Sequence, residues 1–71
     1  MRTSYDEKAD TFYITTEVGA SADYVQEYTS DILFRYKNNT PIGITVLNYS
    51  FHDDSLLEEL IYNELGINFK F

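Results

Sequence analysis

The acidic residues near the start of the chain are the first candidates for chemistry. Asp6, Glu7 and Asp10 lie close together in the sequence, and neighbouring carboxylates can bind a cation or serve as general acid and base. No companion histidine, nucleophile or second carboxylate motif stands at a spacing that completes such a site. Asp side chains also close turns by accepting backbone N–H bonds. We therefore interpret this segment as a turn between two strands.

The second polar cluster is His52-Asp53-Asp54. A histidine beside carboxylates can bind a divalent ion, but consecutive residues rarely converge on one ion without ligands from elsewhere in the chain. Acidic residues just before a helix are also favoured by the helix dipole. We expect no catalytic residue, no metal and no cofactor. The alternative is a small ligand-binding or metal-binding domain, or an enzyme, that uses Asp6, Asp10 or His52.

Composition limits the class of partner. The 71 residues include 12 Asp and Glu but only five Lys and Arg, which gives a net charge of −7 and argues against nucleic-acid binding. There is no cysteine, no apolar run long enough for a membrane span and no apolar signal segment in residues 1–7. The three glycines are isolated, so no phosphate loop is present. We expect a soluble, acidic, cytoplasmic protein.

Alternation of apolar and polar residues predicts short strands, with turn residues between them. Residues 1–49 are therefore expected to form a small antiparallel sheet of about four or five strands in a meander-like order. The predicted strands are Arg2–Tyr5, Thr11–Thr16, Tyr24–Tyr28, Ile32–Tyr36 and Ile42–Leu47.

The hydrophobic period changes to that of a helix after residue 54. Ser55 and Glu58 have the spacing of a capping box and Gly66 is a natural helix end, which predicts a helix over residues 55–65. Residues 67–71 alternate again and predict a strand-like tail that docks on its own sheet or on a neighbouring chain. The fold class is α+β, in a single domain of residues 1–71.

The segments Tyr5-Asp6, Asp10, Tyr13-Ile14, Phe34-Arg35-Tyr36 and Ile42-Gly43-Ile44 carry a family resemblance. Over roughly residues 3–48 the chain resembles the small bacterial family called domain of unknown function 2283. The resemblance implies a small antiparallel sheet and no established activity, and members often look like partners of small toxin-like or uncharacterised proteins. Thr45 stands where the family usually has Glu, and Asn38-Asn39 replaces its usual acidic turn residues.

A single helix can cover only one face of the sheet. We expect the helix-covered face to carry Phe12, Ile14, Phe34, Ile44 and Val46. Exposed apolar side chains on the other face, or in the tail, would mark a surface for protein association. We therefore expect a non-enzymatic interaction module that forms a homo-oligomer or binds a small basic protein. The candidate interaction residues are Tyr13, Leu33, Leu47 and Tyr49 on the second face and Ile67, Phe69 and Phe71 in the tail.

Overall fold

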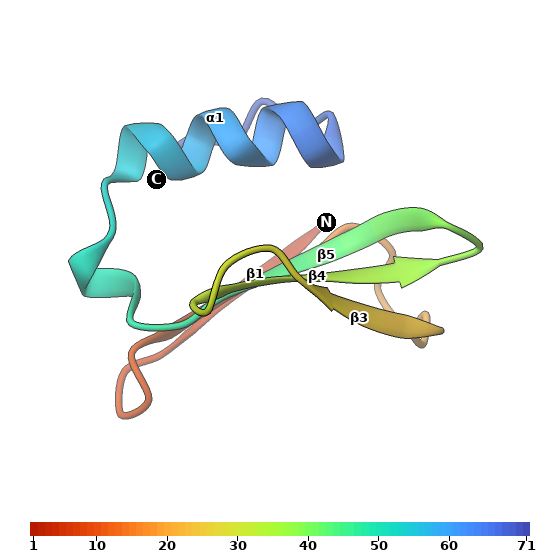
Figure 1. Ribbon diagram of the computed structural model, residues 1–71, viewed down its shortest axis with the longest axis horizontal. Coiled ribbons are helices and arrows are strands. Elements are labelled where there is room, and N and C mark those ends of the chain that lie inside the picture. Colours follow the sequence, from red (N-terminus) through yellow and green to blue (C-terminus); the bar gives the residue numbers. More distant parts are fainter.

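The computed structural model describes residues 1–71 and consists of a five-stranded antiparallel sheet with one α-helix packed against one of its faces (Figure 1). This arrangement confirms the expected small α+β fold. The α-helix has 12 residues and is too short to cross a membrane. The elements in chain order are β1 Arg2–Asp6, β2 Thr11–Thr15, β3 Tyr24–Glu27, β4 Ile32–Lys37, β5 Thr40–Val46, the 3-10 helix η1 Tyr49–Phe51 and α1 Asp54–Leu65.

The strand order across the sheet is β1-β2-β5-β4-β3. Strands β3, β4 and β5 form a meander, and the β1–β2 hairpin is joined to it by pairing of β2 with β5. The connection after β2 therefore crosses to the far edge of the sheet, where β3 begins. This order leaves β1 and β3 as the two edge strands.

Left-handed asparagines form the tight turn between β4 and β5. Asn38 and Asn39 have φ of 52° and 62°, which is the conformation that a two-residue hairpin turn of type I′ requires. Pro41 lies beside a bulge at Arg35/Tyr36, where the ladder is already irregular and the missing N–H costs little.

The core lies between the sheet and α1. Its centre consists of side chains that alternate along β2, β4 and β5 and meet two residues of the helix. Burial of this apolar surface is the main stabilising contribution in a chain of this size. The helix-covered face agrees with the prediction from alternation. The buried cluster is Ile14, Ile32, Phe34, Ile44, Val46, Leu57 and Ile61.

The helix begins one residue earlier than predicted and has a different cap. Asp53 is the N-cap, and its carboxylate accepts the N–H of Leu56 at 3.1 Å. The capping box at Ser55 and Glu58 was wrong, because Ser55 already lies inside the first turn. Gly66 ends the helix as expected, with φ of 70°. Glycine adopts this left-handed conformation without the steric penalty that a side chain would bring.

The tail, residues 67–71, packs on its own chain but pairs with no strand. Its large side chains are half-buried and its intervening ones are exposed, so the predicted alternation holds without a β-ladder. The rings of Phe69 and Phe71 lie 6.1 and 5.0 Å from that of Phe12, and Phe71 donates its N–H to Glu58 at 2.9 Å. The tail therefore completes the core beside β2.

Candidate functional site: the open face of the sheet

The sheet has one face that no other element covers (Figure 1). We call it the open face. Strand register places Tyr13 and Leu33 on either side of Thr45 in one row across the sheet. These two side chains and Leu47 are only half-buried. The residues of the open face used below are Tyr13, Thr15, Val25, Leu33, Arg35, Thr45 and Leu47.

Tyr49 does not lie on the open face, contrary to the expectation from its spacing. The strand ends at Val46, and Asn48 adopts φ of 52° before the chain turns into η1. The Tyr49 ring consequently packs on the helix side, 5.3 Å from the ring of Phe12. Its hydroxyl donates to Asp54 at 3.0 Å.

Arg35 crosses the open face at Gly43, and sequence analysis gave it no role. Its Nη2 donates to the carbonyl of Ile14 at 2.7 Å and to the Thr15 hydroxyl at 2.9 Å. A Cβ at position 43 would collide with this guanidinium and with the Ile14 carbonyl. Gly43 therefore leaves room for the close approach of the Arg35 guanidinium to the strand backbone.

Charge is distributed unequally between the two sides of the molecule. Within the paired strands, register gives the open face three basic residues, Arg2, Arg35 and Lys37, and two acids, Asp6 and Glu27. Helix α1 carries four acidic side chains and no basic one. The open face is therefore close to neutral, while the helix side holds much of the negative charge.

The Asp6 and Asp10 carboxylates hold the β1–β2 turn in place. Asp6 accepts the N–H groups of Lys8 and Ala9 at 3.1 and 3.2 Å, as an Asx turn does. Asp10 has φ of 51° and accepts the Tyr5 hydroxyl at 2.7 Å and the Ser50 hydroxyl at 2.6 Å. It thus connects the turn to η1, forty positions later.

These bonds shift two pKa values in opposite directions. Hydrogen bonds from Ser50 and then Tyr5 lower the pKa of Asp10 below its ordinary value of 3.8. The bond to Asp10 raises the pKa of Tyr5 to about 12. Burial, followed by the bond to Asp54, raises the pKa of Tyr49. Each shift favours the protonation state that the fold uses at neutral pH.

Asp10→Asn should lower the melting temperature at pH 7 and have a smaller effect at pH 2. The lowered folded-state pKa means that ionised Asp10 stabilises the fold above pH 3.8, and that this contribution disappears as the pH falls through the folded-state value. Thermal unfolding of both proteins by circular dichroism between pH 2 and 7 measures the difference. A gap in melting temperature that stays constant over this range would contradict the assignment.

His52, Asp53 and Asp54 have separate partners. The His52 Nε2 lies 3.2 Å from an Asp31 oxygen and 3.1 Å from the Leu47 carbonyl. Asp53 caps α1, and Asp54 accepts from Tyr49. No three His, Asp or Glu side chains are arranged to hold a metal ion.

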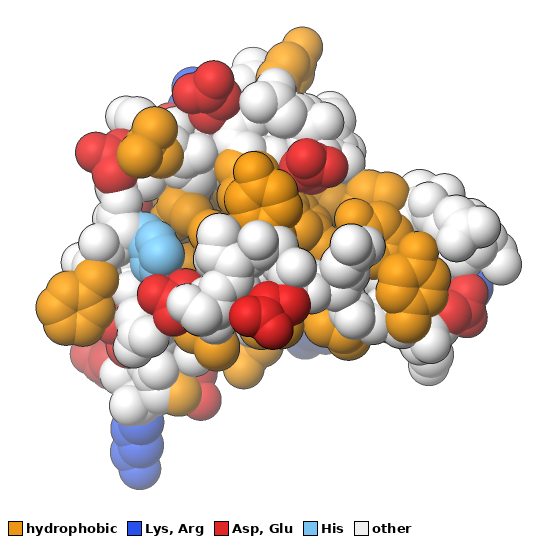
Figure 2. All heavy atoms as spheres, viewed as in Figure 1, with side chains coloured by type: hydrophobic (Ala, Val, Ile, Leu, Met, Phe, Trp, Pro, Cys, Tyr) orange, Lys and Arg blue, Asp and Glu red, His pale blue; other side chains and the backbone are white.

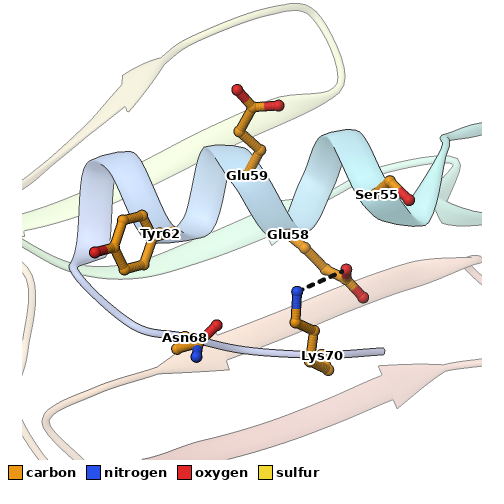
Figure 3. A pocket seen from close by; sticks show the side chains of 6 residues that line it. All are labelled: Ser55, Glu58, Glu59, Tyr62, Asn68 and Lys70. Carbon is orange, nitrogen blue, oxygen red and sulfur yellow. Dashed lines mark ion pairs between the residues drawn. The ribbon is translucent and has the colours of Figure 1, made fainter.

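A groove of about 480 Å³ runs between α1 and the tail (Figure 3). Glu58 and Lys70 reach across it, with Lys70 Nζ 3.6 Å from a Glu58 oxygen. Together with the bond from Phe71 to Glu58, this contact fastens the tail to the helix. The groove walls are mostly polar, and we assign the Glu58 contacts a structural role. The lining residues are Ser55, Glu58, Glu59, Tyr62, Asn68 and Lys70.

Fold and surface together define a class: a small α+β protein whose antiparallel sheet is covered on one face only. The model of a family described as "protein of unknown function (DUF2283)" matches residues 2–50, and the chain belongs to this family. The matched region contains all five strands and the Asp10–Ser50 contact, whereas α1 and the tail follow it. Comparisons with the curated proteins and with the solved structures give no match.

Proposed function

We propose that the protein is a non-enzymatic interaction module that associates with a second copy of itself through the open face. The observation that carries this proposal is the half-buried row of Tyr13, Thr45 and Leu33 on a sheet face that no helix covers. Val25 adds a further apolar side chain, 57% exposed, at the edge of this face. Packing two such faces together removes apolar surface from water, as in a β-sandwich.

Charge favours a second copy as the partner on this face. Two chains of net charge −7 repel each other, but the repulsion is smallest where the meeting surfaces are nearly neutral. The open face has this property, whereas the acidic helix is placed on the outside of such a dimer. A two-fold axis would also allow Arg35 of one copy to approach an acidic side chain of the other.

The carboxylates considered for chemistry support the non-enzymatic interpretation. Asp10 accepts hydrogen bonds from Tyr5 and Ser50, and Asp6 accepts two backbone N–H groups. These contacts engage both oxygens of Asp10 and one oxygen of Asp6 in holding the turn. The half-buried apolar row of the open face supports binding of another protein surface.

Leu33→Lys tests the proposal, with Leu56→Lys as the matched control. Leu33 lies in the open face, while Leu56 is 67% exposed on the helix, so the same substitution places a new charge on opposite sides of the molecule. The lysine at position 33 also lies near Arg35. Sedimentation velocity over a concentration series should show dimerisation weakened by about tenfold or more in Leu33→Lys.

The control should dimerise like the wild type. Circular dichroism must show that both variants remain folded, since both substituted positions are at least partly exposed. Equal association of Leu33→Lys and wild type, or a loss confined to Leu56→Lys, would contradict the proposed surface.

A further inference from the structure

A pocket lies on the helix side of the sheet, where α1 leaves the edge strand β3 uncovered (Figure 1). It has a volume of about 300 Å³ and is bordered by β3, β4 and the end of the helix. Figure 2 looks onto this side: hydrophobic side chains gather between helix and sheet, with Asp and Glu beside them, while Lys and Arg stand at the margins. The lining residues are Gln26, Glu27, Tyr28, Phe34, Tyr36 and Glu64.

Three aromatic side chains line the pocket. Phe34 is buried, and the Tyr28 ring meets it edge-on with centroids 5.7 Å apart. Tyr36 stacks on Tyr24 at 5.0 Å with nearly parallel planes. Ring faces attract a cation through their negative quadrupole, and this attraction increases when the cation is partly desolvated.

The polar groups around these rings have no partner within the chain. The two ion pairs in the structure involve Asp31 and Glu58, so Glu27 and Glu64 are both unpaired. No basic residue lines the pocket. Glu27 lies at the sheet edge, where it borders both the open face and the pocket. Aromatic rings combined with two free carboxylates have the chemistry of a site for a cationic side chain.

Strand β3 supplies the second, independent feature. It pairs only with β4, so alternate N–H and C=O groups along its outer edge have no strand partner. An extended segment that adds to this edge would direct every second side chain toward the pocket side of the sheet. Two copies that paired along β3 would each bring a net charge of −7 to the contact and repel each other. A basic segment avoids this repulsion.

We infer that β3 and its adjoining pocket bind an extended basic segment of a partner protein, with a lysine or arginine side chain held between the aromatic rings, Glu27 and Glu64. The pocket lies on the helix side of the sheet and shares only Glu27 with the edge of the open face, so its occupation does not require the proposed dimer. The partner is recognised by backbone pairing along the edge and by one cation in the pocket. A basic partner is also attracted by the net charge of −7 on this chain.

Binding of a nine-residue peptide of alternating lysine and valine tests the inference. The fluorescein-labelled peptide is titrated with wild-type protein, with Glu27→Gln/Glu64→Gln and with the control Glu7→Gln/Glu59→Gln, which removes the same charge from other exposed positions. The pocket variant should bind about tenfold more weakly than wild type, and the control within about twofold. Replacing lysine by glutamine in the peptide should weaken its binding to the wild-type protein at least as much as the pocket variant weakens binding of the lysine peptide.

Backbone NMR locates the site in the same samples. Peptide should shift the amide signals of residues 24–28 and leave those of Leu33 and Thr45 largely unchanged. Absence of binding, equal weakening in both double variants, or shifts confined to the open face would each overturn the inference. If Leu33→Lys no longer dimerises but still binds the peptide, the β3 site is supported independently of the proposed dimer.

Discussion

Phe34→Ala should lower the free energy of unfolding by about 3–5 kcal/mol, the largest effect of any substitution considered. Phe34 is 2% exposed and lies at the centre of the buried cluster between the sheet and α1. Removing its ring leaves a cavity. Strand β4 is hydrogen-bonded to β3 on one side and to β5 on the other, so it cannot move to fill this space. A domain of this size has little stability to spare, so much of the variant should be unfolded at 37 °C.

Phe51→Ala is the matched control for this substitution. Phe51 lies in η1 and is 86% exposed, so loss of its ring should change the stability by about 0.5 kcal/mol or less. Urea unfolding followed by circular dichroism compares the three proteins. Similar midpoints for Phe34→Ala and Phe51→Ala would contradict the placement of the core.

Phe69→Ala/Phe71→Ala should lower the free energy of unfolding by about 3 kcal/mol, because two half-buried rings and their aromatic contacts are lost. Both rings pack against Phe12, and Phe71 also lies 5.3 Å from Tyr49. The double variant should keep the wild-type tendency to dimerise while it remains folded. This combination distinguishes a tail that completes the core from a tail that binds another chain.

Asn68→Ala/Lys70→Ala provides the comparison at the exposed positions of the same segment. Lys70 is mostly exposed and its contact with Glu58 is 3.6 Å, so the expected loss is below about 1 kcal/mol. Urea unfolding measures stability, and sedimentation measures association. A stable Phe69→Ala/Phe71→Ala protein that no longer dimerises would show that the tail is the interface.

Alternation predicted the strands and the helix-covered face because both depend on local spacing. Phe12, Ile14, Phe34, Ile44 and Val46 had to share a side once their segments were extended. The same rule failed for Tyr49. The left-handed conformation of Asn48 stops the alternation of side chains that β5 sets and turns the chain toward the helix side. Spacing alone carries no signal for where a strand stops contributing to the sheet.

The missed tertiary contacts join residues that are distant in the sequence. Arg35 bonds to Ile14, and Asp10 bonds to Ser50, and neither pairing has a local pattern. The tail alternates like a strand, but its backbone bonds to Glu58 instead of joining a ladder. Tertiary packing determined these outcomes, whereas the helix cap is a local contact in which Asp53 accepts the N–H of Leu56, three residues later.

The β3 pocket lay outside the sequence-based predictions for a similar reason. Its residues come from β3, β4 and the last turn of α1, and no local spacing indicates that these three segments meet. The sequence does show several tyrosines in this region, but their place beside an uncovered edge strand depends on how α1 packs on the sheet.

The central claim, association through the open face, is tested most directly by intermolecular NMR contacts in a sample that mixes isotope-labelled and unlabelled chains. The proposed dimer predicts nuclear Overhauser effects between the Tyr13 ring of one copy and the methyl groups of Leu33 or Leu47 of the other. Contacts that instead involve Phe69, Leu56 or the β3 edge would contradict it. So would a sample that keeps the 8.3 kDa mass of a single chain at the concentrations used.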